Sequence, residues 1–405
     1  MDARSGKSRL SRREFLRGAT AAGAALALSR WLPRAATVRR SAPASPAVAA
    51  HRVVHAHNDG ATSWGYATGW YGDYVSQAVV DEMTDQGVTA LTDTSTRADA
   101  WRALIPAYTP GQIVAIKINL VNASCADEDQ HIDALPQPIN SVIRGLKETG
   151  VSEPDIWVYD MTDANIQSQM PARLVNKVIA LYPDVQFHSC LCSTTLGFSA
   201  TQKIHFNVPS GKPAITDRPI CNALVNAFYL INMPIMKKHD SPGVTLGFKN
   251  HFGSFEHCYD VHWTVIIPGP DYTSAYSGLV DVYNNTHFKT KTVLTVGDGL
   301  YGARFHYNDV PSPWPSFGDK SPNSLFFSID PVAMDCVMYD HLAAEVEVPI
   351  RLGADDYLKL AANQENPLGV FEHWNAAHQY QTIDYRRIER RVYVPLIRRD
   401  DDWRP

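Results

Sequence analysis

Short apolar runs recur along the chain, and most have the length and composition of buried β-strands. The first three cover residues 113–120, 155–160 and 227–231. Two later runs cover residues 292–296 and 325–329. Apolar runs of about four to eight residues bounded by polar turns are typical of strands that are covered on both faces. We therefore predict that these five segments form a buried sheet.

Segments with a helical spacing of apolar residues lie between the strands. In residues 137–150, Ile139 and Leu146 fall on one helical face, and a glycine ends the segment. Further helices are predicted over residues 74–86 and 172–181. The order strand, helix, strand favours right-handed parallel units. The sequence thus predicts the α/β class, with a mostly parallel sheet, helices on both faces and long loops at the carboxyl ends of the strands.

The composition is that of a globular protein. The chain has 405 residues, of which 45% are hydrophobic and 20% are charged, and its formal net charge is −5. This charge gives no reason to expect a nucleic-acid-binding surface. Beyond the amino terminus no apolar run is long enough for a permanent membrane span. We expect a signal and linker over residues 1–50, a single large α/β domain over 51–395 and a charged tail over 396–405.

An export signal is the most specific pattern in the sequence. Arg12 and Arg13 are adjacent, Phe15 follows two positions on, and a small-residue apolar run covers residues 18–28. These features are the signature of the twin-arginine route, whose translocase carries folded proteins, often with a cofactor already bound. Small residues at 47–49 offer a cleavage site. We predict export to the periplasm or the extracellular space; the alternative is an arginine-rich disordered tail.

Cationic and imidazole side chains follow the strand at 227–231, where its carboxyl end is expected. Lys237, His239 and Lys249 are interleaved with a glycine-containing turn at 242–245. Ligands of open α/β sheets bind beyond the carboxyl ends of strands, and a partly desolvated lysine among other cations can act as a nucleophile. We assign catalytic roles to these three side chains, with His239 as general acid or base. A polar surface loop is the alternative.

Acidic and amide side chains at other strand ends are expected to meet this segment. Asp160 ends the strand at 155–160, and we assign it a catalytic role; a turn-forming acid is the alternative. Lys117 interrupts the run at 113–120, where an amine is costly unless it has a partner, reaches a cleft or lies on an edge strand. The residues expected to bind substrate or cofactor are Lys117, Asn119, Gly243, Thr245, Asn250 and Asp298.

Residue types that bind metals are dense just after this segment. Glu256, His257, Cys258, Asp260 and His262 lie within seven positions. Thiolate and imidazole ligands favour a transition metal over magnesium or calcium. The alternative is a polar loop that caps the sheet. The predicted metal ligands are His251, His257, Cys258, His262 and Asp335.

The six cysteines do not have the spacing of a ferredoxin-type iron–sulfur site. Cys190 and Cys192 are too close together for a regular zinc knuckle, and no second pair follows at zinc-finger spacing. Cysteines of an exported protein can form disulfides, but export in a folded state starts from a reducing compartment. Disulfides therefore remain an open alternative. We predict structural or free thiols rather than ligands of a cluster.

Six motifs together resemble a known family, the domain of unknown function 362 family. They are IKINL (116–120), WVYD (157–160), INMPIMKKH (231–239), GVTLGFKNHFG (243–253), VGDGLYG (296–302) and SIDPVAMD (328–335). The resemblance extends from about residue 53 to about residue 390. Many members of that family carry ferredoxin-like cysteine clusters, which this chain lacks, so the resemblance does not imply electron transfer.

A shorter stretch resembles the nickel-pincer-dependent lactate racemases. That family has a strand, a histidine, a glycine-rich turn and a lysine that carries the cofactor covalently. His239 and Lys249 are similarly arranged. His251, His257 and His262 are the candidates for the downstream metal-binding histidine that the resemblance implies. The glycine pattern differs, so the cofactor itself is not assigned.

Together these observations predict an exported enzyme that depends on a metal or a metal-containing cofactor. Lys249 would bind the cofactor or an anionic substrate, and Asp160, Asp298 and Asp335 would orient hydroxyl groups or hold a metal. A second hypothesis is a non-catalytic binding protein that captures a small anion at the lysines. A third is a structural or assembly partner, for which an exposed apolar patch would be required.

Overall fold

The computed structural model describes residues 49–126, 130–161, 169–345 and 350–390. These residues fall within one compact unit of the chain. The predicted twin-arginine motif and the predicted charged tail over 396–405 lie outside the described residues. No helix in the described ranges is long and apolar enough to cross a membrane.

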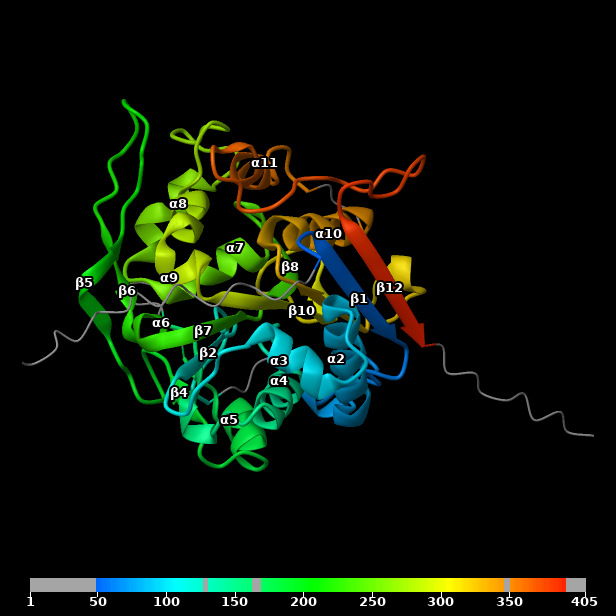
Figure 1. The fold of residues 1–405 in the computed structure, drawn as a ribbon. Helices are drawn as coiled ribbons and strands as arrows, with labels where there is room; N and C mark the ends of the chain where they lie inside the picture. The colour runs from blue at the N-terminus through cyan, green and yellow to red at the C-terminus, as the bar shows by residue number, and fades with distance from the viewer. Residues whose placement is uncertain (1–48, 127–129, 162–168, 346–349, 391–405) are drawn as a thin grey trace, which may run out of the picture. The chain divides into compact units, whose positions relative to one another are not determined.

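A ten-stranded sheet organises the described chain (Figure 1). Its main path runs β12 (Asp384–Arg390), β1 (Arg52–Asn58), β11 (Ser324–Ser328), β10 (Thr292–Ala303), β7 (Ala227–Asn232), β2 (Ile113–Lys117), β3 (Ile156–Tyr159) and β4 (Gln186–His188). Neighbouring strands along this path pair in parallel, except that β11 is antiparallel to both β1 and β10. The predicted α/β class with a mostly parallel sheet is confirmed.

Helices cover both faces of the sheet, and the strands alternate accordingly. α2 (Gln77–Thr92), α3 (Arg97–Leu104), α4 (Pro136–Glu148) and α5 (Ala172–Ile179) enclose one apolar core. α8 (Gly278–Asn284), α10 (Pro331–Ala344) and α11 (Asp356–Asn363) enclose the other. Along β1, Val54 belongs to the first core and Val53 to the second. Successive strand residues point to opposite faces, so β1 contributes to both cores.

A short strand pair and a helical turn occupy the segment predicted to carry the site. β8 (Ile235–His239) lies parallel to β10 and pairs antiparallel with β9 (Gly243–Thr245). Gly243 has a φ of +90°, which glycine adopts without steric cost. α7 (Gly247–Asn250), the 3-10 helix η3 (His251–Ser254) and the 3-10 helix η4 (Cys258–Thr264) follow. Lys249 and Asn250 therefore lie on a helical turn and not on an open loop.

The remaining elements connect these layers. They are the 3-10 helices η1 (Tyr71–Tyr74), η2 (Glu153–Asp155) and η5 (Pro315–Phe317), the helices α6 (Asn222–Asn226) and α9 (Thr286–Lys289), and the hairpin of β5 (Phe198–Ile204) and β6 (Arg218–Cys221). A disulfide joins Cys125, after β2, to Cys192, after β4. The two loops that follow these strands are thus tied together, while Cys221 and Cys336 are buried free thiols.

Element boundaries differ from the sequence predictions at three places. The helix predicted over 74–86 is α2, which begins after its N-cap Ser76 and continues to Thr92. The strand predicted over 113–120 ends at Lys117. The strand predicted over 292–296 continues to Ala303, because its second half pairs with β8. In the last two cases the boundary depends on pairing partners that are distant in sequence.

Candidate functional site

A buried ion pair lies where β2 and β3 end. β2 is an interior strand between β7 and β3, so the edge-strand explanation of Lys117 is wrong. The side chain of Lys117 is 1% exposed, and its Nζ lies 3.1 Å from Oδ1 of Asp160. Burial lowers the pKa of Lys117, and the negative charge of Asp160 opposes this shift. The lysine predicted to need a partner or a cleft has a partner.

Asp160 also holds the backbone that follows β2. Its Oδ2 accepts a hydrogen bond from the backbone N–H of Leu120 at 2.7 Å. Gly253 lies directly against the pair, since a Cβ built there would be 1.7 Å from Asp160 Oδ1 and 2.7 Å from Lys117 Nζ. Asp160 therefore anchors the chain after β2 to β3 and leaves no space for a side chain at position 253.

Three asparagine amides connect this ion pair to α7 and β7. Asn250 Oδ1 accepts hydrogen bonds from Lys117 Nζ at 3.3 Å and from Asn119 Nδ2 at 3.1 Å. Asn250 Nδ2 donates to Asn232 Oδ1 at 2.8 Å, and Asn232 Nδ2 donates to the carbonyl of Gly247 at 3.0 Å. Asn119 and Asn250, which were predicted to bind a substrate or cofactor, thus bind each other, and Asn250 also binds Lys117.

Lys237 extends the network with a second buried amine. Its side chain is fully buried, and among the described residues its Nζ donates one hydrogen bond, to Asn119 Oδ1 at 2.9 Å. Burial lowers the pKa of Lys237 to about 8, although Asp133 and Asp160 raise it. Thr245 is the direct cross-strand neighbour of Lys237, and its hydroxyl is buried without a hydrogen-bond partner in the described chain. Both donors thus have unused capacity.

Lys249 is the third amine, and it is partly exposed. Its Nζ lies 3.5 Å from Nε2 of His262 and 4.3 Å from the centre of the Phe252 ring. Burial lowers the pKa of Lys249 to about 8, and the charge of Lys237 lowers it further, while the Cys258 thiol opposes the shift. A fraction of Lys249 is therefore a neutral amine at neutral pH.

His262 is a neutral proton acceptor beside this amine. Its Nδ1 lies 3.2 Å from the carbonyl oxygens of Cys258 and Tyr259. A nitrogen facing carbonyl oxygens must carry the hydrogen, which leaves Nε2 as the acceptor that faces Lys249. Burial, together with the charge of Lys249, lowers the pKa of His262 to about 3.

His239 is a second neutral imidazole near the amines. Its ring stacks on Tyr307 with the centroids 4.7 Å apart, and its Nδ1 accepts the backbone N–H of Ser241 at 3.2 Å. The hydrogen therefore resides on Nε2. Burial lowers the pKa of His239, and the charges of Lys249 and Lys237 lower it further. The charge of Lys249 thus acts electrostatically on His239.

The structure gives Asp335 another role than the predicted one of metal ligand. Its Oδ1 accepts a hydrogen bond from the backbone N–H of Gly247 at 2.7 Å. Its Oδ2 accepts hydrogen bonds from the backbone N–H of Phe248 at 3.1 Å and from the Tyr357 hydroxyl at 2.9 Å. Burial raises its pKa to about 7. Asp335 binds the first N–H groups of α7, so it holds the turn that carries Lys249.

His251 does not face the other predicted metal ligands either. It is fully buried, and its ring packs edge-on against Tyr283 and Phe288 at centroid distances of 5.4 and 4.9 Å. Neither ring nitrogen has a hydrogen-bond partner in the described chain. Burial lowers its pKa well below the usual value. His251 is a neutral side chain of the second apolar core.

The predicted set of five metal ligands is therefore not assembled. His257 is half-buried beside Glu256, 3.9 Å away, Cys258 is buried, and His262 faces Lys249. In the ranges that the structure describes, no group of three or more His, Cys, Asp or Glu side chains could hold a metal ion. Ligand-type residues close in sequence diverge here because η3 and η4 turn their side chains in different directions.

Asp298 and Gly243 border the site without joining the amines directly. Asp298 accepts the backbone N–H of Leu300 at 3.0 Å, and its backbone lies opposite Ile235 of β8. Burial raises its pKa to about 7. Gly243 lies against Ala354, where a Cβ would be 2.4 Å from the alanine Cβ. The first residue supplies a protonatable carboxyl group, and the second allows close packing.

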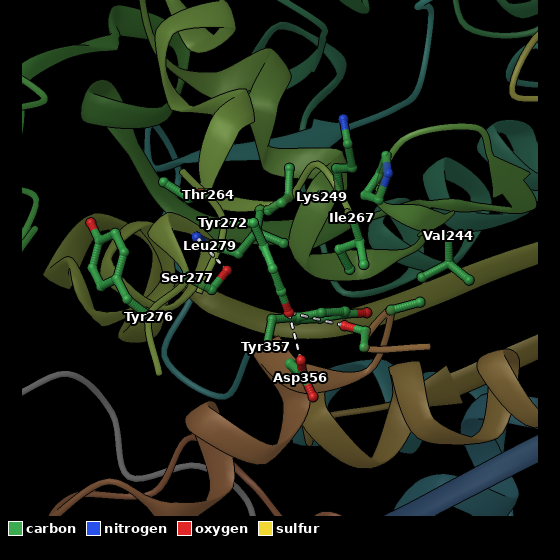
Figure 2. Close-up of a pocket in the computed structure, with 14 residues that line it drawn as sticks. Val244, Lys249, Thr264, Ile267, Tyr272, Tyr276, Ser277, Leu279, Asp356 and Tyr357 are labelled. Atoms are coloured by element: carbon green, nitrogen blue, oxygen red, sulfur yellow. Dashed lines mark hydrogen bonds between the residues drawn. The ribbon is translucent and has the colours of Figure 1, made fainter. Parts of the chain in front are cut away.

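A small cavity lies along the stem of Lys249. Its volume of about 20 Å³ suits a water-sized molecule. Tyr272, Tyr276, Ser277, Asp356 and Tyr357 line it, together with aliphatic side chains. Figure 2 shows that the Lys249 amine points away from Tyr357 and Asp356. The stem thus forms part of the cavity wall, while the amine lies beside His262.

Sequence reasoning missed four residues that shape the site. Asn232 could have been found, because it is a polar residue at the end of a buried strand within the INMPIMKKH motif. Phe252 lies under the Lys249 amine, Tyr307 under the His239 ring, and Tyr357 on Asp335. These three are ordinary aromatic residues in sequence, and only their packing gives them a role.

The fold and this site define an α/β protein in which three lysines and two neutral histidines gather at strand ends. Residues 114–340, more than half of the chain, match the family described as "Domain of unknown function (DUF362)". The chain belongs to that family, as its motifs predicted. None of the curated proteins searched matches the sequence.

Proposed function

We propose that this protein is an enzyme that binds a small anionic substrate beside Lys237 and Lys249 and exchanges a proton with it through Lys249. One observation carries the proposal: the partly exposed Lys249 amine lies 3.5 Å from the acceptor nitrogen of a neutral histidine. An amine with a pKa of about 8 beside an imidazole acceptor is suited to proton transfer near neutral pH.

The charge balance supports an anionic substrate. In the part of the chain that the structure describes, no carboxylate lies within ion-pair distance of Lys237 or Lys249. Asp160 compensates Lys117 instead. Two amines with unused hydrogen-bonding capacity, next to neutral imidazoles, attract a carboxylate or a phosphate. The anion would supply the negative charge that the protein does not place there.

The test of this proposal is a screen for turnover. Purified protein would be incubated with pools of small carboxylates and phosphates, and product formation would be followed by NMR. We expect one pool to be converted, and we expect Lys249→Met to fold normally and convert nothing. Anions that stabilise the protein through Lys237 and Lys249 without any turnover would instead favour the non-catalytic binding protein.

We also propose a metal-containing cofactor, loaded before export, as predicted from the sequence. A bare ion would need several protein ligands, which the described residues do not gather. A cofactor that brings its own donors needs less, and Lys249 and His262 would offer it one amine and one imidazole. Elemental analysis and an absorption spectrum of protein exported by its native host test this. Stoichiometric metal that is lost in Lys249→Met is the expected result.

The proposed twin-arginine export is supported by the Cys125–Cys192 disulfide, because disulfides persist in oxidising compartments outside the cytoplasm. Replacing Arg12 and Arg13 together by lysine tests it. We expect the variant to stay in the cytoplasm of the native host, whereas the unchanged chain is found outside it. Equal distributions of the two would contradict the proposed route.

A further inference from the structure

The three lysines of the site differ in ways that matter for covalent chemistry. Lys117 is buried and ion-paired with Asp160, and Lys237 is fully buried. Lys249 is partly exposed and has no carboxylate within ion-pair distance among the described residues. A lysine acts as a nucleophile when its amine is both reachable and unprotonated. Of the three, Lys249 meets both requirements.

We propose that Lys249 forms an imine with a small aldehyde or ketone that carries an anionic group. This inference rests on the proposed function, because it names the substrate class of the same site. The neighbouring positive charge of Lys237 attracts the anionic compound. His262, beside Lys249, accepts protons from the amine and donates them to the carbonyl oxygen. An amine, a proton acceptor and a second cation thus surround one reaction centre.

The groups around Lys249 are sufficient to balance the step. The nitrogen lone pair of Lys249 attacks the carbonyl carbon, a C–N bond forms, and the carbonyl electrons move to oxygen. His262 Nε2 takes the two protons of the amine nitrogen in turn and returns each to the oxygen, which leaves as water once it carries both. The products are a C=N bond and one water molecule. No oxidant, reductant or further reactant is needed.

The surroundings hold the nucleophile in place. The stem of Lys249 lines the cavity with Tyr357 (Figure 2). Its amine lies over the Phe252 ring, 4.3 Å from the ring centre. Asp335 fixes the first N–H groups of α7, one turn of backbone from Lys249. A nucleophile on a rigid element approaches the carbonyl carbon from a fixed direction, which favours the reaction.

Reductive trapping tests the inference. The purified protein would be treated with glyoxylate, an anionic aldehyde, or with acetaldehyde, a neutral one, in the presence of cyanoborohydride near neutral pH. Peptide mass spectrometry would locate the reduced adducts, with the exposed Lys320 as an internal reference. We expect glyoxylate to label Lys249 roughly tenfold faster than it labels Lys320, because the local positive charge concentrates the anion.

Two variants separate the nucleophile from the charge that selects the substrate. Lys249→Arg keeps the charge and is expected to remove the adduct. Lys237→Met is expected to slow labelling of Lys249 by glyoxylate more than labelling by acetaldehyde. Circular dichroism and thermal unfolding establish that both variants fold. Equal labelling of Lys249 and Lys320, or the same rate for both aldehydes, would overturn the inference.

The outcomes also distinguish this inference from the proposed function. If a substrate is turned over in a Lys249-dependent reaction and no adduct forms, the imine is wrong and proton transfer by Lys249 stands. If neither turnover nor an adduct occurs, both are wrong. An untreated protein whose Lys249 already carries a covalent group would overturn the imine and favour the attached cofactor.

Discussion

The two ends of the lysine cluster treat a buried charge in opposite ways. At the Lys117 end, a carboxylate, a carbonyl and one side-chain amide surround the amine, and a glycine packs against it. At the Lys249 end, the neighbours are a neutral imidazole, an aromatic ring and another cation. A compensated charge stabilises a fold, whereas an uncompensated one is costly and persists at functional sites. We infer that the first end is structural and the second functional.

Replacing Asp160 by asparagine would break this comparison most severely. The change leaves the Lys117 ammonium buried without its counter-charge, and the loss of one partner of a buried pair costs about 3–5 kcal/mol. Urea unfolding at neutral pH measures it. Asp99→Asn is the matched control, because Asp99 pairs with Arg102 at an exposed site, where the expected cost is below about 1 kcal/mol. Equal costs would show that the Lys117 end is not structural.

Gly253→Ala perturbs the Lys117 end by steric overlap, without changing any charge. The new Cβ would overlap Asp160 Oδ1 at 1.7 Å, so the ion pair or η3 must shift, at a cost of about 1–3 kcal/mol. Gly65→Ala is the control, because nothing lies within 4 Å of a Cβ there. The urea concentrations at the unfolding midpoints of the two variants measure this difference in stability. A Gly253→Ala variant as stable as Gly65→Ala would mean that the contact is not close in solution.

Lys237→Met tests the comparison through the pH dependence of the free energy of unfolding. The folded-state pKa of Lys237 is about 8 and the unfolded value is about 10.4, so between these values the unfolded chain binds more protons. The contribution of Lys237 to the free energy of unfolding therefore rises with pH across this window. We expect the stability advantage of Lys237→Met over the unchanged protein to be largest below pH 8 and to shrink towards about pH 10.4. A gap that does not depend on pH would contradict the lowered pKa.

Lys249→Met should cost no stability and should have the largest effect on function. It removes a partly desolvated charge without a described carboxylate partner, so below the lowered pKa of about 8 the free energy of unfolding should not decrease. Turnover of the identified substrate should be lost in Lys249→Met and Lys249→Arg alike, since neither supplies the amine. Retained turnover in Lys249→Arg would limit Lys249 to binding the anion.

The sequence was sufficient to predict the sheet and the gathering of polar side chains at its strand ends. Apolar runs fixed the strands β2, β3, β7, β10 and β11 to within a few residues, except where pairing with β8 lengthened β10. The carboxyl ends of parallel strands lie along one edge of a sheet, so Lys117, Asp160 and Lys237 were expected to come together. Lys117 and Asp160 form an ion pair, and Lys237 is linked to Asn119 of the same network.

The partners of the individual side chains were beyond the sequence. Asp335 and His251 have the residue types of metal ligands, yet one holds the N–H groups of α7 and the other packs against Phe288. The sequence also did not show which of the three lysines forms an ion pair with a carboxylate. Apolar periodicity is a local property that a short window reveals, whereas hydrogen-bond and ion-pair partners are set by elements far apart in sequence. The tertiary structure alone decided these partners, because a buried polar atom is stabilised by a hydrogen bond to a group that the fold brings next to it.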